Sequence, residues 1–184
     1  MKYIIYSQND KIRNDFGIEL SKYLSKNEEI YLIDLDSKNR DLAEYFDVCE
    51  YTIYDTEDVL NKIVDITQAS IDVNDNLFLL SSSVIDKYDF SKDINFYVEN
   101  YILLVKNYNV YKNLNGEKFY ITDSIIENIN DKVVSYGLGK KELKILSKKS
   151  NLVSYKELDN FIEKALDGKR IEFKNIFEKI FNRK

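Results

Sequence analysis

KYIIYSQNDKIRNDFGIELSKYLSKNEEIYLIDLD (residues 2–36) is the stretch that decides the fold class. It opens with a β-branched and aromatic run, KYIIYS, which is typical of a buried strand. Apolar residues then recur at helical spacing through residues 11–26, which predicts an amphipathic helix. EIYLIDLD predicts a second strand after a short polar turn. A strand, a helix and a strand joined in this way predict two parallel neighbours in one sheet.

The rest of the chain continues as a mixture of short strands and helices. We expect helices at 41–46, 55–66, 122–130, 155–166 and 171–184, strands at 76–83, 101–107 and 132–139, and a hairpin at Asn115-Gly116. The predicted fold class is therefore α/β, with a mainly parallel central sheet flanked by helices. Residues 1–167 are expected to form one domain, and residues 168–184 a C-terminal amphipathic helix.

Composition excludes several classes of function. The 184 residues are 44% hydrophobic, which is ample for a packed core, and no apolar run approaches the roughly 20 residues that span a bilayer. Because there is no histidine and only one cysteine, Cys49, the usual zinc sites and every histidine-based catalytic scheme are excluded. A lone cysteine fits a reducing cytosol. A net charge of -5 argues against nucleic acid as a partner.

The turn after the first strand lacks what a phosphate-binding loop requires. Such a loop needs glycines, so that backbone N–H groups can wrap around phosphates, together with a Lys and a Ser/Thr. Here the turn reads SQNDKIRND, no glycine precedes Gly17, and GK[ST] is absent from the chain. Asp10 and Asp15 would place negative charge where a phosphate should lie. We therefore expect neither conventional ATP binding nor ATP hydrolysis, no metal site and no cofactor.

Beyond that turn, the order of segments resembles the MinD/ParA ATPases over residues 1 to about 85. The resemblance rests on FGIELSKYLSKNEEIYLIDLDSKNRDLAEYF, on TIYDTEDVLNKI and on NLFLLSSS, in that order and spacing. It implies that Asp36 matches the acidic residue that helps to activate water, and that Asn14 and Asp15 fall near the positions of the Lys and Ser/Thr. The family's switch segment contains a proline, whereas this chain has none, and YILLVKNY occupies the corresponding position.

This pattern indicates a pseudo-ATPase with no catalytic residues. Its vestigial positions would be Asn14, Asp15, Asp34 and Asp36. An alternative interpretation of Asp34 and Asp36 is that they are solvated or capping carboxylates at a strand end.

The C-terminal segment is basic and amphipathic. Residues 168–184 contain six basic and two acidic residues, so they carry +4 against -9 for the rest of the chain. A helix with Phe and Ile on one side and Lys and Arg on the other suits an anionic membrane interface, and MinD proteins end in a similar helix. Two alternatives remain, since the helix would equally suit its own domain's core or a partner's groove. The predicted membrane-binding residues are Phe173, Lys174, Ile176, Phe177, Lys179, Ile180, Phe181, Arg183 and Lys184.

These features predict a non-catalytic localisation or scaffold protein at the inner face of a bacterial cell membrane. By resemblance it would position pilus, flagellar or division machinery, and the CpaE/TadZ-like pilus branch is attractive because degenerate phosphate loops occur there. Its partners would be the membrane, an assembly component, a related ATPase or a second copy. One rival is a nucleotide or small-ligand sensor or enzyme that uses Asp34, Asp36 and Lys11 at the strand-end crevice. A receiver-like signalling domain is a poorer rival, because Asp10 lacks an acidic partner.

Overall fold

The computed structural model describes residues 1–85, 88–171 and 173. These residues fall into two compact units, a first within Met1–Ile121 and a second that begins at Thr122. Of the residues predicted to bind membrane, Phe173 is described, and it lies outside any helix or strand. The other predicted membrane-binding residues, from Lys174 to Lys184, lie outside the described part of the chain, as does the expected helix that they would form. Within the described ranges, no helix has both the length and the hydropathy needed to cross a bilayer.

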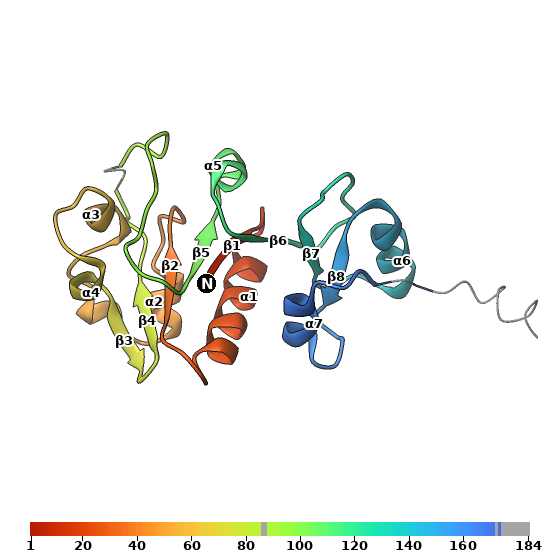
Figure 1. Ribbon diagram of the computed structural model, residues 1–184, viewed down its shortest axis with the longest axis horizontal. Coiled ribbons are helices and arrows are strands. Elements are labelled where there is room, and N and C mark those ends of the chain that lie inside the picture. Colours follow the sequence, from red (N-terminus) through yellow and green to blue (C-terminus); the bar gives the residue numbers. More distant parts are fainter. Residues whose placement is uncertain (86–87, 172, 174–184) are drawn as a thin grey trace, which may run out of the picture. The chain divides into compact units, whose positions relative to one another are not determined.

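The first unit is built on a mainly parallel sheet with strand order β3-β4-β2-β5-β1-β6 (Figure 1). The pairs β1–β5, β1–β6, β2–β4 and β2–β5 are parallel, and the pair β3–β4 is antiparallel. The predicted α/β fold class with a mainly parallel sheet is therefore confirmed. The strands are β1 (Lys2–Tyr6), β2 (Ile30–Asp34), β3 (Ile71–Asn74), β4 (Leu77–Leu80), β5 (Tyr101–Val105) and β6 (Glu117–Thr122).

Short helices connect these strands and cover the sheet. The first unit contains α1 (Asp10–Leu24), α2 (Asp41–Tyr45), the 3-10 turn η1 (Cys49–Tyr51), α3 (Thr56–Leu60), α4 (Ile66–Ala69) and α5 (Tyr108–Asn113). Every residue of β5 is buried, as expected for a strand with both faces covered.

Helices α1 and α5 cover opposite faces of the sheet. Side chains alternate between the two faces along a strand, so Leu104 and Val105 at the end of β5 point in opposite directions. Leu104 lies against α1, where a Cβ placed on Gly17 would be 2.7 Å from Leu104 Cδ2. Val105 is paired with Tyr6, whose ring contacts Tyr111 of α5 at a centroid distance of 5.2 Å. Glycine at position 17 thus permits a close approach between α1 and the sheet.

The second unit contains a parallel strand pair with helices. Its elements are β7 (Lys132–Ser135), α6 (Lys140–Lys149), β8 (Leu152–Tyr155) and α7 (Phe161–Asp167), and β7 pairs with β8. Lys132 Nζ donates to Leu166 O at 2.8 Å, and Ser154 Oγ donates to Phe161 O at 2.6 Å, so both strands are tied to α7.

Two sequence predictions in the first unit need correction. The hairpin at Asn115-Gly116 is wrong, because residues 108–113 form α5 and β6 runs parallel to β1. The physical reason is the side chain of Asn107, whose Oδ1 accepts from the N–H groups of Asn109 and Val110 and so starts a helix. The helix expected over 55–66 is divided into α3 and α4, with Lys62 in the left-handed region at φ 61° between them. The short strand β3 was not predicted.

In the second unit, the helix expected over 122–130 is wrong. Ser124 N donates to Thr122 Oγ1 at 3.1 Å, and Thr122 Oγ1 lies 3.0 Å from Ser124 O. Such local side-chain bonds compete with helix formation. The helix expected over 155–166 begins only at Phe161, since Tyr155 ends β8. Helix α6 and strand β8 were not predicted.

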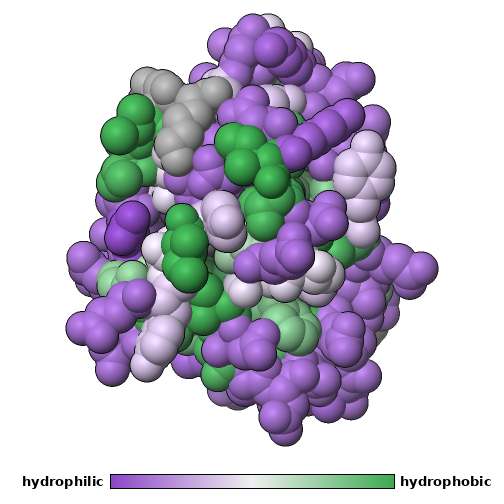
Figure 2. Space-filling view, turned by 90° about the vertical axis from the view of Figure 1, so that its left-hand side faces the viewer, coloured by the Kyte–Doolittle hydropathy of each residue, from purple (hydrophilic) through white to green (hydrophobic). Residues whose placement is uncertain are grey.

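The surface of the first unit also exposes large apolar side chains. Figure 2 shows the side of Figure 1 on which α3, α4 and β3 lie, with hydrophobic side chains scattered among mainly hydrophilic ones. Single exposed apolar residues of this kind are ordinary on protein surfaces, whereas a large contiguous apolar patch would indicate an interaction site.

Candidate functional site

The carboxyl ends of four parallel strands meet at one edge of the first unit's sheet. Tyr6 of β1 is in register with Val105 of β5, Asp34 of β2 with Leu104, and Ile33 with Leu80 of β4. The segments that follow these strands therefore come together. Ligands of open α/β sheets bind at this kind of edge, so it is the place to look for a site.

The connection from β1 to α1 is only Ser7–Asn9. Asn9 caps the helix, because its Oδ1 accepts from Lys11 N at 3.1 Å, while Asn9 N donates to Ser7 Oγ at 3.1 Å. A phosphate-binding loop offers its backbone N–H groups to the ligand, whereas here these two N–H groups are already bound to side chains of the chain itself. The short connection leaves no loop to surround a phosphate.

A buried arginine lies in the first turn of α1. Arg13 is fully buried, and its Nη1 is 3.0 Å from Asp10 Oδ1. Its Nε and Nη2 donate to Asn14 Oδ1 at 3.3 and 3.1 Å. Lys106, in the segment after β5, reaches the other oxygen of Asp10 with Nζ at 2.8 Å. Two cations of the chain thus converge on the carboxylate at the start of α1.

Asp36 joins the end of β2 to the end of β5. Its two carboxylate oxygens accept from the backbone N–H groups of Lys106 at 2.6 Å and Asn107 at 2.8 Å. Burial raises the pKa of the Asp36 carboxyl, while these two N–H groups and the charges of Arg13 and Lys106 oppose the rise. In this arrangement the carboxylate acts as a cap for the segment after β5.

Asp34 is the most deeply buried carboxylate at this edge, with a residue exposure of 1%. Burial raises its pKa to about 6, although the charge of Arg13 and hydrogen bonds from Ser37 and Ser82 oppose the shift. Oδ2 accepts from Ser37 Oγ and, at 3.2 Å, from Ser82 Oγ. Oδ1 has no hydrogen-bond partner among the residues that the structure describes. Asp34 is therefore a costly group to keep ionised here.

The structure brings together three of the four predicted vestigial positions. Asn14 binds Arg13 directly, and the charge of Arg13 acts on both Asp34 and Asp36. Asp15 is half-buried one position further round α1, outside these contacts, and the side chain of Lys11 is exposed.

Arg13 itself was missed by the sequence analysis, although it had a signal. It lies at helical spacing with Phe16, Leu20 and Leu24, all buried on α1, so a charged residue occupies the helix's buried face. A cation in such a position needs anionic partners, and those partners lie at this edge.

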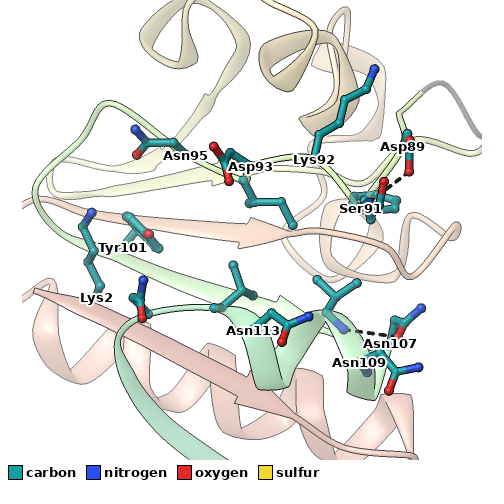
Figure 3. A pocket seen from close by; sticks show the side chains of 15 residues that line it. Lys2, Asp89, Ser91, Lys92, Asp93, Asn95, Tyr101, Asn107, Asn109 and Asn113 are labelled. Atoms are coloured by element: carbon teal, nitrogen blue, oxygen red, sulfur yellow. Dashed lines mark hydrogen bonds between the residues drawn. The ribbon is translucent and has the colours of Figure 1, made fainter.

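A cavity of about 750 Å³ lies on the α5 face of the same sheet (Figure 3). It is lined by residues 89–95, by residues of α5 and by the starts of β1 and β5, at Lys2 and Tyr101, and it opens to the surface. Its lining is polar and rich in asparagine. Asn107 lines the cavity and also donates its backbone N–H to Asp36. The cavity therefore adjoins the strand-end group, by which we mean Asp10, Arg13, Asn14, Asp34 and Asp36.

Comparison with solved structures identifies the class of fold. The chain is similar to a plasmid partition protein from Borrelia burgdorferi, with a TM-score of 0.65 and 19% identity over 91% of this chain and 98% of that one. A Borrelia burgdorferi partition protein bound to AMPPNP matches with a TM-score of 0.63 and 17% identity, over 91% and 96% of the two chains. The MinC:MinD cell division complex of Aquifex aeolicus matches with a TM-score of 0.59 and 14% identity, over 92% and 86%.

The chain therefore has the fold of MinD and the plasmid partition proteins, and the resemblance seen in the sequence is confirmed at the level of fold. No family model and no curated protein matches the sequence.

Proposed function

We propose that this chain is a catalytically inert relative of the MinD/ParA ATPases that serves as a localisation or scaffold protein. The observation that carries the proposal is the state of the strand-end group. Arg13 is buried against Asp10 and Asn14, and Asp36 is bound to two backbone N–H groups. The charged side chains at this edge are thus engaged with other groups of the chain itself.

Three features argue against ATP hydrolysis at this edge. The connection Ser7–Asn9 offers no glycine-rich loop, Asp10 places a carboxylate at the start of α1, and Arg13 is already paired with it. A phosphoryl-transfer site needs cations aimed at the transferring phosphate.

The test of inertness is phosphate release from ATP–Mg²⁺ by the full-length chain, with and without anionic vesicles. We expect the background rate in both conditions. A rate above background that disappears in Asp36→Asn would contradict the proposal. The exposed Asp65, which lies between α3 and α4, provides the matched control Asp65→Asn.

We further propose that residues 168–184 attach the protein to anionic membrane. Support comes from the sequence, with a net charge of +4 and Phe and Ile on one predicted helical face. Co-sedimentation should compare the full chain with a chain ending at Gly168 on neutral and anionic vesicles. Pelleting that needs both the C-terminal segment and anionic lipid is the expected result. Equal pelleting of the two chains, or none, would refute membrane attachment.

The fold also supports the kind of partner that we propose. Solved neighbours include a MinC:MinD complex, which is an assembly between different proteins. For this chain we propose protein partners in a membrane-associated assembly for a pilus, a flagellum or division, with a second copy or a related ATPase among them.

A second candidate function, a small-ligand sensor, is favoured by the cavity beside α5. Its volume of about 750 Å³ lies in the usual range for ligand sites. Asn107 connects the cavity with the end of β2, because it lines the cavity and its backbone N–H donates to Asp36. A thermal-shift screen of nucleotides and polar metabolites tests it, with Asn113→Leu as the variant that should remove any shift. If a ligand's shift is unaffected by Asn113→Leu, the ligand binds elsewhere.

A further inference from the structure

Helix α6 of the second unit is strongly basic. Its ten residues, KKELKILSKK, contain five lysines and one glutamate, so they carry a net charge of +4. The whole chain carries -5. A concentration of positive charge in an otherwise acidic protein creates a local positive potential, and such a potential attracts an anionic partner.

Four of the five lysines share one face of α6. Leu143 and Leu146 are buried and hold the helix on the second unit. At about 3.6 residues per turn, the four lysines fall within an arc of about 100° on the side away from these leucines. We call Lys140, Lys141, Lys144 and Lys148 the α6 lysine face. Three of its members are exposed and Lys144 is half-buried, while Ile145 beside them is 41% exposed.

The charges of the α6 lysine face are not neutralised by the part of the chain that the structure describes. The fifth lysine, Lys149, is paired with Glu127. The helix's own carboxylate, Glu142, accepts from Gly139 N at 2.9 Å and so caps the first turn. Among the described residues, no carboxylate forms an ion pair with the four lysines of the face. Their charge is therefore available to a partner.

The composition of this face favours lipid headgroups over nucleic acid. Ile145 adjoins the lysines, and a membrane interface accepts both cations and an apolar side chain, whereas a row of nucleic-acid phosphates would leave the Ile in water. The net charge of -5 also opposes nucleic-acid binding, whose affinity comes from neutralised phosphates.

The C-terminal segment leaves the second unit beside the end of α6. Arg170 Nε donates to Ser147 O of α6 at 3.1 Å, and Ile171 N donates to Leu152 O at 2.8 Å. Phe173, the first predicted membrane-binding residue, follows Arg170 by three residues, which span at most about 11 Å. A lipid surface that binds the segment from Phe173 onward would therefore lie close to the end of α6.

We propose that the α6 lysine face is a second contact with anionic lipid headgroups, in addition to residues 168–184. This proposal rests on the membrane attachment proposed above and names a surface of the folded second unit that takes part in it. The C-terminal segment supplies the apolar anchor. The lysines add electrostatic attraction and turn α6 toward the lipid.

The test replaces the charges in the full-length chain. Lys140→Gln, Lys141→Gln, Lys144→Gln and Lys148→Gln are combined, because Gln keeps a helix propensity close to that of Lys. The combined variant should raise the Kd for vesicles of phosphatidylcholine and phosphatidylglycerol at least about tenfold, since each lysine near an anionic surface adds to the binding free energy. The difference should shrink at high salt. Lys→Arg at the same four positions should keep the original Kd.

A matched control changes the net charge by the same amount elsewhere. Lys11→Gln, Lys26→Gln, Lys62→Gln and Lys92→Gln lie at exposed positions of the first unit, and their combination should leave the Kd nearly unchanged. Far-UV circular dichroism and urea unfolding check that both combined variants are folded.

A fluorescent probe tests the contact without removing any lysine. Cys49→Ser is combined with Ile145→Cys, and the introduced thiol is labelled with an environment-sensitive dye. Its emission should move to shorter wavelength with the anionic vesicles and stay constant with pure phosphatidylcholine. The same dye on Asp65→Cys, at an exposed position of the first unit, should show no such change.

The results separate this proposal from membrane attachment itself. If the unaltered chain binds anionic vesicles and the α6 variant binds them as tightly as the control variant, the α6 contact is refuted while attachment stands. If the unaltered chain does not bind, both ideas fail. Binding to duplex DNA that is lost in the α6 variant, with vesicle binding unchanged, would assign the face to nucleic acid and overturn the proposal.

Discussion

At the scale of single residues, Asp34 is a group that the fold keeps at a cost. Its pKa of about 6, against an ordinary 3.8, means that the folded state holds a proton that the unfolded chain has released between these two values. Folding stability from this group therefore falls as pH rises from about 4 to 6, and the penalty is fully present at neutral pH. A shift of this size corresponds to a penalty of about 2–3 kcal/mol.

Replacing the carboxylate tests this reasoning. Asp34→Asn should raise the free energy of unfolding by about 2 kcal/mol at pH 7.5, because an amide cannot ionise, and the gain should shrink steadily as the pH falls through 6 toward the ordinary pKa of 3.8. Urea unfolding at several pH values measures it, with the exposed Asp65→Asn as a control that should show no such dependence. A loss of stability at pH 7.5, or a gain independent of pH, would show that the buried charge is not costly.

Arg13 is the counterpart of that carboxylate. It is fully buried, and its charge lowers the pKa of both Asp34 and Asp36 against the effect of burial. Arg13→Met should cost about 3–5 kcal/mol, because the carboxylates then lose their buried cation. Adding Asp34→Asn should recover part of this loss, so the two changes will not be additive. A double-mutant cycle by urea unfolding provides the test, and Arg40→Met, at an exposed arginine, is the control. If the changes in unfolding free energy of the two single variants add up to that of the double variant, Arg13 and Asp34 do not interact energetically.

At the scale of elements, the packing of α1 on β5 depends on the absence of a side chain at Gly17. The space that a side chain at position 17 would need is occupied by Leu104, which is itself fully buried and cannot move into solvent. Gly17→Val should therefore destabilise the first unit by about 1–3 kcal/mol through overpacking. Thermal or urea unfolding measures the loss.

The controls for this element are Lys11→Val and Leu104→Ala. Lys11 is exposed in the same helix, so its replacement should cost only the small difference in helix propensity. If the overpacking account holds, Leu104→Ala should be less harmful in the Gly17→Val background than in the natural chain. Equal costs in both backgrounds would argue against a direct clash.

The elements that the sequence predicted correctly are those whose pattern is local. β1, α1, β2 and β5 each show an uninterrupted strand or helix pattern, and the structure contains all four close to the expected bounds. The failures depend on competing local bonds. Asn115-Gly116 has the composition of a hairpin turn, but the cap that Asn107 places on α5 makes the chain cross over to a parallel strand instead.

The candidate site was predictable only in part for a related reason. Residues at strand ends, such as Asp34 and Asp36, can be placed because parallel strands share an edge. The partners of a buried cation cannot be placed by spacing alone, so Arg13 was recognised only when the structure showed Asp10, Asn14 and the strand ends around it.

At the scale of the whole molecule, ligand linkage offers the most direct test of the inert strand-end group. A ligand that binds only the folded state at a concentration 1,000 times its Kd adds about 4.1 kcal/mol to the free energy of unfolding. One millimolar ATP–Mg²⁺ would therefore stabilise a protein with a micromolar site by that amount. We expect no measurable change here, because Asp10 lies at the start of α1 and Arg13 is already paired with it. Urea unfolding with ATP–Mg²⁺, GTP–Mg²⁺ and inorganic triphosphate at equal ionic strength makes the comparison. A gain with ATP alone would shift support to the ligand-sensor function, and its loss in Asn113→Leu would assign the nucleotide to the cavity beside α5.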